Sequence, residues 1–292
     1  MEKQYPNMTI NWFPGHMAKA LRELEENLKK IDLVLCVLDA RAPYSCINLE
    51  LEKRLNGKKL AYIINKTDLA DEAVTKEWIK YFEAAGKTVV SVSATGKSSK
   101  KAIISCINDG LRERVAKQKA RGITLINRVA VVGVPNTGKS TIINSLAGSY
   151  MAKTGNLAGV TRSSSWIKIG GSVELMDNAG TLYPKLAINK VAENLAFIGS
   201  VSDNAVDELE LSKCLLFRLF NLCPQKLAGR YEIDLTASTV DILFNQIALS
   251  RGYILKGEKI DEIRTAKAII DDFRKGKIGK ISLETPKEEY VK

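Results

Sequence analysis

The fold is constrained most strongly by a glycine-rich segment in the middle of the chain, GVPNTGKS at residues 133–140. An apolar run at 129–132 precedes it and predicts a buried strand, and residues 141–146 predict a helix. Glycines at such a junction let backbone N–H groups turn toward phosphates at the positive end of the helix. The pattern predicts an α/β protein whose phosphate-binding loop consists of Gly133, Pro135, Asn136, Thr137, Gly138, Lys139, Ser140 and Thr141.

Two positions, Ser140 in that loop and Asp177 beyond it, are candidates for holding magnesium. The Ser140 hydroxyl suits a magnesium ligand, while Lys139 is placed to reach the β- and γ-phosphates. DNAG at 177–180 follows an alternating strand, so the Asp177 carboxylate lies at a strand end, where it can bind magnesium directly or through water. Asp-x-x-Gly alone is more often an ordinary turn, and its distance of some forty residues from the loop strengthens the assignment.

The polar connector at 150–164 and the glycine of DNAG are candidate sensors of the γ-phosphate. The connector contains GVTR, in which Thr161 can bring its hydroxyl to magnesium and order the loop. The Gly180 N–H can contact the γ-phosphate. Together these residues predict two switch segments.

A base-recognition motif, NKTD at 65–68, follows the apolar run 60–64. The Asp68 carboxylate offers two acceptor oxygens, which match the N1–H and amino donors of guanine but not adenine. The Lys66 stem can lie along the purine, and Asn65 can brace the adjoining loop. Ser93 and Ala94 follow the next strand, where a backbone N–H can face the guanine oxygen. Taken alone, NKTD fits a polar strand-to-helix turn equally well.

These motifs stand in inverted order, because NKTD precedes the phosphate-binding loop instead of following it. Nucleotides bind beyond the carboxyl ends of the strands of an open α/β sheet, so spatial proximity matters and chain order does not. A circular permutation therefore preserves the pocket. It also places the second switch next to the C-terminal part of the chain, on which a displaced switch can act.

The remaining pattern predicts two domains, which agrees with a length of 292 residues. Residues 1–200 predict a circularly permuted nucleotide-binding domain with a mostly parallel sheet and helices on both faces. Residues 201–292 predict a small all-α domain with an extended tail. Expected strands span 33–38, 60–64, 88–92, 128–132 and 173–176; expected helices span 18–30, 49–55, 72–85, 100–115, 141–146, 206–222, 238–251 and 261–274, with turns at 224–229 and 252–257 and a basic linker at 117–121.

The formal net charge of +11 lies on the first 200 residues and is densest over 97–121. This balance favours a polyanionic partner, nucleic acid first, although a solvated helix face that aids solubility is the alternative. Five cysteines without a Cys-x-x-Cys pair, and one histidine, disfavour a zinc site and fit reduced thiols in a cytosol. The N-terminus does not fit a signal peptide, and the longest apolar run, 33–38, is too short for a bilayer, so we expect a soluble protein.

The single histidine, His16, lies in NWFPGHMAKA before an expected helix. Such a histidine usually caps a helix or lies on the surface. Many nucleotide switches carry a glutamine directly after Asp-x-x-Gly to orient the attacking water, but this chain has Thr181 there. A catalytic group then has to come from elsewhere, and histidine can hydrogen-bond water near neutral pH.

Order and motifs together resemble the circularly permuted GTPases, specifically the bacterial ribosome-biogenesis GTPase A family of the YlqF type. The resemblance runs nearly end to end, through WFPGHMAKA, DARAP, NKTD, GVPNTGKS, GVTR, DNAG, RGYILKGEKID and DFRKGKIGKISLETP. It implies hydrolysis of GTP to GDP and phosphate, with Mg²⁺, in late maturation of the large ribosomal subunit. It also implies that His16 acts on the attacking water, that Asn136 helps bind K⁺, and that the C-terminal helices bind rRNA and the pre-ribosomal particle. We expect a cytoplasmic protein that is a monomer off the ribosome.

Three departures from the family pattern bear on turnover more than on nucleotide identity. DNAG replaces the usual Asp-Thr-Pro-Gly, Thr181 replaces a hydrophobic residue, and Ala158 precedes Gly159 where proline is common. Three other readings remain: a kinase or ATPase, which NKTD disfavours; a GTP-binding RNA scaffold without particle-stimulated hydrolysis; and a mitochondrial member of the family, which an N-terminus poor in Arg and Ser disfavours.

Overall fold

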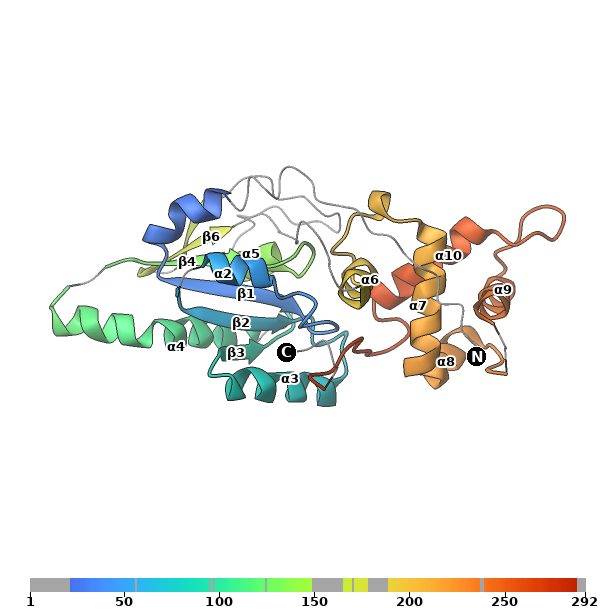
Figure 1. Cartoon of the computed structure of the whole chain (residues 1–292), viewed down its shortest axis with the longest axis horizontal. Helices are drawn as coiled ribbons and strands as arrows, with labels where there is room; N and C mark the ends of the chain where they lie inside the picture. The colour runs from blue at the N-terminus through green and yellow to red at the C-terminus, as the bar shows by residue number, and fades with distance from the viewer. Residues whose placement is uncertain are drawn as a thin grey trace.

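The computed structural model describes residues 22–55, 57–94, 96, 98–123, 125–148, 165–169, 171–177, 189–236 and 239–287. In this part of the chain, a sheet covered by helices occupies one end of an elongated molecule and a group of helices occupies the other (Figure 1). Residues 22–27 are helical and continue into the 3₁₀ turn η1 (Leu28–Lys30), which leads to the first strand.

The described sheet has six strands in the order β3-β2-β1-β4-β6-β5. All pair in parallel except β5, which lies antiparallel to β6 at one edge, so the expected mostly parallel sheet is confirmed. The strand order reverses between β1 and β4, and the crevice beyond their carboxyl ends is where such sheets bind ligands. The strands are β1 (Leu33–Asp39), β2 (Leu60–Asn65), β3 (Thr88–Ser91), β4 (Asn127–Val132), β5 (Ser165–Ile169) and β6 (Val173–Asp177).

Both faces of the sheet are buried, because successive side chains of a strand point to opposite sides. In β1, every residue is buried. Val34, Cys36 and Leu38 join the apolar cluster that includes α2 (Leu49–Arg54) and α3 (Glu72–Ala84). Leu33, Leu35 and Val37 join the cluster beneath α4 (Ser99–Ala120) and α5 (Lys139–Ala147). This double cover confirms the expected helices on both faces.

The helices after β6 pack around α7 (Glu208–Leu222), which contacts four of the others. The other elements are α6 (Asn189–Phe197), η2 (Asp203–Ala205), α8 (Pro224–Tyr231), α9 (Val240–Ser250) and α10 (Glu262–Arg274). The N-terminal amides of α7 are capped by Asp207, as those of α9 and α10 are by Thr239 and Asp261, so polar residues set where these helices begin. Within the described residues, no helix is long and apolar enough to cross a bilayer.

Four details differ from the sequence-based expectation. Helix α4 continues to Ala120, so the basic run at 117–121 extends the helix and is not a linker; its residues favour helix until Gly122. Residues 224–229 form most of α8, because Pro224 occupies the first turn, where proline is tolerated. Strand β5 and helix α6 were not expected at all.

Candidate nucleotide-binding site

The loop between β4 and α5 is closely packed against the ends of β1 and β2. Gly133 and Gly138 have φ angles of 150° and 93°, in the region that favours glycine. A Cβ atom on Gly133 would lie 2.4 Å from the carbonyl oxygen of Val37, and one on Gly138 would lie 2.3 Å from Asn65 Nδ2. Glycine is therefore required at both positions by conformation and by space, as the phosphate-loop pattern predicts.

Lys139 is buried at the start of α5, and its ammonium group points back into the loop. Its Nζ donates to the carbonyl oxygen of Val134 at 2.9 Å, and Thr137 Oγ1 donates to the same oxygen at 3.1 Å. Burial lowers the pKa of Lys139 to about 8, although the nearby Asp177 carboxylate opposes this shift. A bound phosphate would add negative charge beside the buried ammonium, so the site suits an anionic ligand.

Asp177 ends strand β6 and is also buried. Burial raises the pKa of its carboxyl to about 6, while Lys139 and a hydrogen bond from Ser140 act in the opposite direction. Its Oδ1 has no hydrogen-bond partner among the described residues. A buried carboxylate oxygen beside a serine hydroxyl is the donor set that Mg²⁺ prefers, so Asp177 and Ser140 fit this cation.

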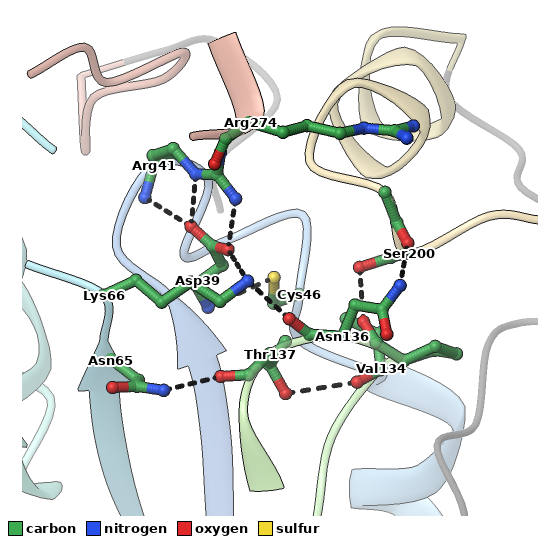
Figure 2. Close-up of polar contacts among 12 residues, drawn as sticks. Asp39, Arg41, Cys46, Asn65, Lys66, Val134, Asn136, Thr137, Ser200 and Arg274 are labelled. Atoms are coloured by element: carbon green, nitrogen blue, oxygen red, sulfur yellow. Dashed lines mark hydrogen bonds and ion pairs between the residues drawn. The ribbon is translucent and has the colours of Figure 1, made fainter. Parts of the chain in front are cut away.

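Asn65 joins the base-recognition motif to the phosphate loop (Figure 2). Its Nδ2 donates to the carbonyl oxygen of Thr137 at 2.8 Å, and its Oδ1 accepts from the backbone N–H of Ala94 at 3.0 Å. One buried side chain thus ties together the ends of β2 and β3 and the loop after β4. This is the bracing role expected for Asn65.

Lys66 takes a left-handed backbone conformation, with φ of 60°, directly after β2. Its Nζ donates to the carbonyl oxygen of Asn136 and forms an ion pair with Asp39 Oδ2 at 2.9 Å (Figure 2). The lysine therefore spans from the base-recognition motif to the phosphate loop, and its amino group is fixed at both contacts.

Asp39, at the end of β1, is a buried residue of this site. The sequence indicated it only as part of the DARAP motif on which the family resemblance rests. Its carboxylate accepts Nε and Nη2 of Arg41 at 2.9 and 2.8 Å, in addition to the Lys66 ion pair. Burial opposes its ionisation, but the two cations outweigh that effect and hold the pKa of Asp39 well below its usual range. The sequence feature that could have identified Asp39 is a charged residue at the end of an otherwise apolar strand.

The phosphate loop is also bonded to the segment between α6 and η2, which no sequence pattern indicated. Asn136 Nδ2 donates to the carbonyl oxygen of Gly199 at 2.6 Å, and Ser200 Oγ donates to that of Pro135 at 2.7 Å (Figure 2). Asn136 itself has a φ of 61°, a conformation that asparagine adopts more readily than most residues. The loop is thereby joined to the C-terminal helices.

The other candidate residues lie as follows. Asp68 is exposed in the turn after β2, and Ser93 and Ala94 are half-buried after β3. Thr141 lies in the first turn of α5. Three candidates lie outside the described residues: His16, Thr161 and Gly180. Among the described residues, the structure brings together the base-recognition motif, the phosphate loop and the candidate magnesium ligands Ser140 and Asp177.

Comparisons with known proteins agree with this geometry. Residues 128–216 match the family described as "50S ribosome-binding GTPase". The chain is 37% identical to ribosome biogenesis GTPase A of Bacillus cereus over 96% of its length and 95% of that protein, and 29% identical to that of Thermotoga maritima over 96% and 95%. The solved structure of GNP-bound YlqF from T. maritima matches with a TM-score of 0.63 and 26% identity, covering 92% of this chain and 99% of that one. The chain belongs to the ribosome biogenesis GTPase A family.

Proposed function

We propose that this GTPase hydrolyses GTP on the large ribosomal subunit or its precursor during late maturation, in the cytoplasm, and is released afterwards. The observation that carries the nucleotide assignment is the bond between Asn65 and Thr137, which unites the inverted motifs in one crevice. Family membership supports the ribosomal role, because relatives carry names such as "Ribosome biogenesis GTPase A" and "Mitochondrial ribosome-associated GTPase 1".

In the proposed nucleotide complex, Asp68 reads the guanine edge and Lys139 reaches the β- and γ-phosphates. The Lys66 stem lies along the base, and the turn at Ser93 and Ala94 supplies a backbone N–H to the guanine oxygen. Backbone N–H groups of Gly133 to Thr141 surround the phosphates.

Magnesium would be held by Ser140 and Asp177, with Thr161 as the third protein ligand. When bound, the ion neutralises charge that develops on the phosphates. The Gly180 N–H is proposed to contact the γ-phosphate. The unsatisfied Oδ1 of Asp177 supports the assignment of this carboxylate.

His16 is proposed as the residue that orients the attacking water, because Thr181 lacks the amide that glutamine would supply. Asn136 is proposed to help bind K⁺ through its side-chain oxygen, since potassium is coordinated by carbonyl-type oxygens. The amide nitrogen of Asn136 is held by Gly199, and this contact fixes the orientation of the side chain.

The proposed partner is rRNA within the particle, contacted by the helical domain at 201–292, while residues 1–200 form the GTPase domain. The second half of α4 supplies exposed positive charge for phosphate contacts. Lys117, Lys119 and Arg121 form no salt bridge among the described residues. Off the ribosome, the protein is proposed to be a monomer.

Co-sedimentation with purified large subunits tests this proposal. A non-hydrolysable GTP analogue should retain the protein on the particle, GDP should not, and raising salt from about 50 to 200 mM should weaken retention at least tenfold. Retention that is equal with both nucleotides would instead favour an RNA scaffold that uses GTP only for stability.

A further inference from the structure

The chain after α10 returns from the helices to the base-recognition motif. After α10, residues 276–284 run back toward the sheet beside α3 (Figure 1); we name this segment the C-terminal strap. The Ile281 N–H donates to the carbonyl oxygen of Leu69 at 3.0 Å. Ser282 Oγ accepts from the N–H of Asp71 at 3.2 Å. Leu69 follows Asp68 directly, so the strap contacts the turn that carries the proposed guanine reader.

Two further observations show how closely the strap fits this turn. Gly276 has a φ of 71°, and a Cβ atom there would lie 2.7 Å from Leu69 Cδ2. The Asp71 side chain caps the N-terminus of α3 by accepting from Ala73 and Val74. The turn at 68–71 is therefore held between the helix that it caps and the strap that contacts it.

The far end of the strap is anchored by a buried carboxylate. Glu284 is 1% exposed, and it accepts from the Ser45 N–H at 3.0 Å, the Ser45 hydroxyl at 2.6 Å and Asn194 Nδ2 at 3.1 Å. Trp78 Nε1 donates to its carbonyl oxygen at 3.3 Å. Since a buried charge is costly without partners, these donors fix the position of the strap on the GTPase part.

Arg41 forms a second route from the C-terminal helices to base recognition (Figure 2). Its carbonyl oxygen accepts from the Leu283 N–H at 2.7 Å, and its Nη1 donates to the carbonyl oxygen of Arg274 at 3.3 Å. The guanidinium lies 5.2 Å from the ring centroid of Phe273. Through Asp39, the same guanidinium is linked to Lys66.

We propose that the C-terminal strap is a positioning element of the guanine-binding loop, so that docking of the strap and binding of guanine nucleotide strengthen each other. In the proposed complex, Asp68 and Lys66 face the base. The strap bonds Leu69, the residue after Asp68, and Arg41 is linked to Lys66 by way of the Asp39 carboxylate. Thermodynamic linkage requires the effect to be reciprocal. A change that displaces α10 or the strap from the GTPase part weakens nucleotide binding, and bound nucleotide stabilises the docked strap. The proposal rests on the assignment of Asp68 as guanine reader.

The test compares Glu284→Gln with Lys287→Gln in the full-length protein. Glu284→Gln places an amide N–H group against the donors of Ser45 and Asn194. The strap should therefore bind the GTPase part more loosely, while no residue of the nucleotide site is changed. Lys287 lies just beyond the strap, is largely exposed and pairs with Glu77, so it serves as the matched control. We expect Glu284→Gln to raise the Kd for GDP about tenfold. It should also shrink the preference for GDP over IDP, which lacks the amino group that Asp68 reads.

Hydrogen exchange on the wild-type protein gives a second test that does not depend on a variant folding. GDP should slow exchange at the Ile281 and Leu283 amides together with those of the phosphate loop. The proposal is overturned if these two amides exchange equally with and without GDP, or if a folded Glu284→Gln keeps wild-type GDP affinity and base preference.

Asp68→Asn separates the two assignments. If it shifts base preference while Glu284→Gln and the strap amides show no effect, the site assignment stands and the strap proposal fails. If Asp68→Asn leaves GDP binding unchanged, both fail.

Discussion

The side-chain amide of Asn65 donates to the carbonyl oxygen of Thr137 at 2.8 Å, although 72 residues separate them in the chain. A Cβ atom on the neighbouring Gly138 would come within 2.3 Å of the same amide nitrogen. The base-recognition motif and the phosphate loop are thus in direct contact, and permutation of chain order has left their spatial relationship intact.

Asn65→Ala should raise the Kd for GDP, and this loss of binding free energy should exceed the loss of stability in the rest of the protein. It removes the partner of the Thr137 carbonyl and of the Ala94 N–H, and each unsatisfied buried group costs about 1–3 kcal/mol. We expect a roughly 10- to 100-fold rise in Kd, measured by titration calorimetry. Asn108→Ala, at an exposed position of α4, is the control and should change Kd by less than about twofold. A wild-type Kd for Asn65→Ala would contradict the bracing role.

Asp68→Asn should exchange guanine for xanthine specificity. The carboxylate has only acceptors, whereas the amide combines an acceptor oxygen with an NH₂ donor group, which suits the carbonyl that xanthine carries in place of the guanine amino group. A binding site strongly rejects a ligand whose hydrogen-bonding groups no longer match its own. The Kd for GDP should therefore rise by about 100-fold or more, while XDP binding appears. Competition binding with GDP, XDP and ADP measures this. Unchanged preference would revive the kinase or ATPase reading.

Asp177→Asn should remove the contribution of magnesium to nucleotide binding. With a non-hydrolysable GTP analogue in Mg²⁺, we expect Kd to rise about tenfold, because a carboxylate ligand is lost. In excess EDTA the variant should bind no more weakly than wild type, since removing a buried negative charge near phosphates is not costly. Glu174→Gln, on the same strand but paired with Arg128, is the control. Equal sensitivity of Asp177→Asn and wild type to EDTA would exclude Asp177 as a ligand.

Asp39→Asn should make the protein less stable at neutral pH by about 3 kcal/mol, because it breaks a buried ion pair. Arg41 and Lys66 hold the folded-state pKa of Asp39 below its unfolded value of about 3.9. The stabilisation is therefore fully present above the unfolded pKa and is lost as pH falls through the folded one. Urea unfolding from pH 7 to pH 3 should show the gap between wild type and variant narrowing below about pH 4. A gap that does not change with pH would contradict this electrostatic account.

Local periodicity predicted much of the fold. The strands β1, β2 and β4 are apolar runs that end at polar motifs, and α10 has apolar residues on one face, so their own sequences specify them. The sequence predicts a turn at 224–229, because Pro224 and Gly229 break helices in most positions, but the first turn of a helix tolerates proline and these residues form most of α8. Strand β5 is short and pairs only at the sheet edge, so its signal is weak.

The candidate site was predictable where motifs carry the chemistry and not where the chain folds back on itself. Motifs and their position after expected strands predict Asn65, Lys139 and Asp177 as candidate site residues. The contacts of Asn136 with Gly199 and of Ser45 with Glu284 join residues 63 and 239 positions apart. No local pattern reports such pairings, because they depend on how the C-terminal helices pack against the sheet.

The proposed role on the ribosome is tested by measuring GTP hydrolysis with and without purified large ribosomal subunits, in potassium and in sodium buffer, for wild type and His16→Ala. We expect slow intrinsic hydrolysis, strong stimulation by subunits in potassium, and loss of stimulation in His16→Ala with GDP affinity intact. If subunits stimulate both proteins equally, the ribosomal role stands and the histidine role fails. A hydrolysis rate that subunits do not change in either buffer would contradict the ribosomal role.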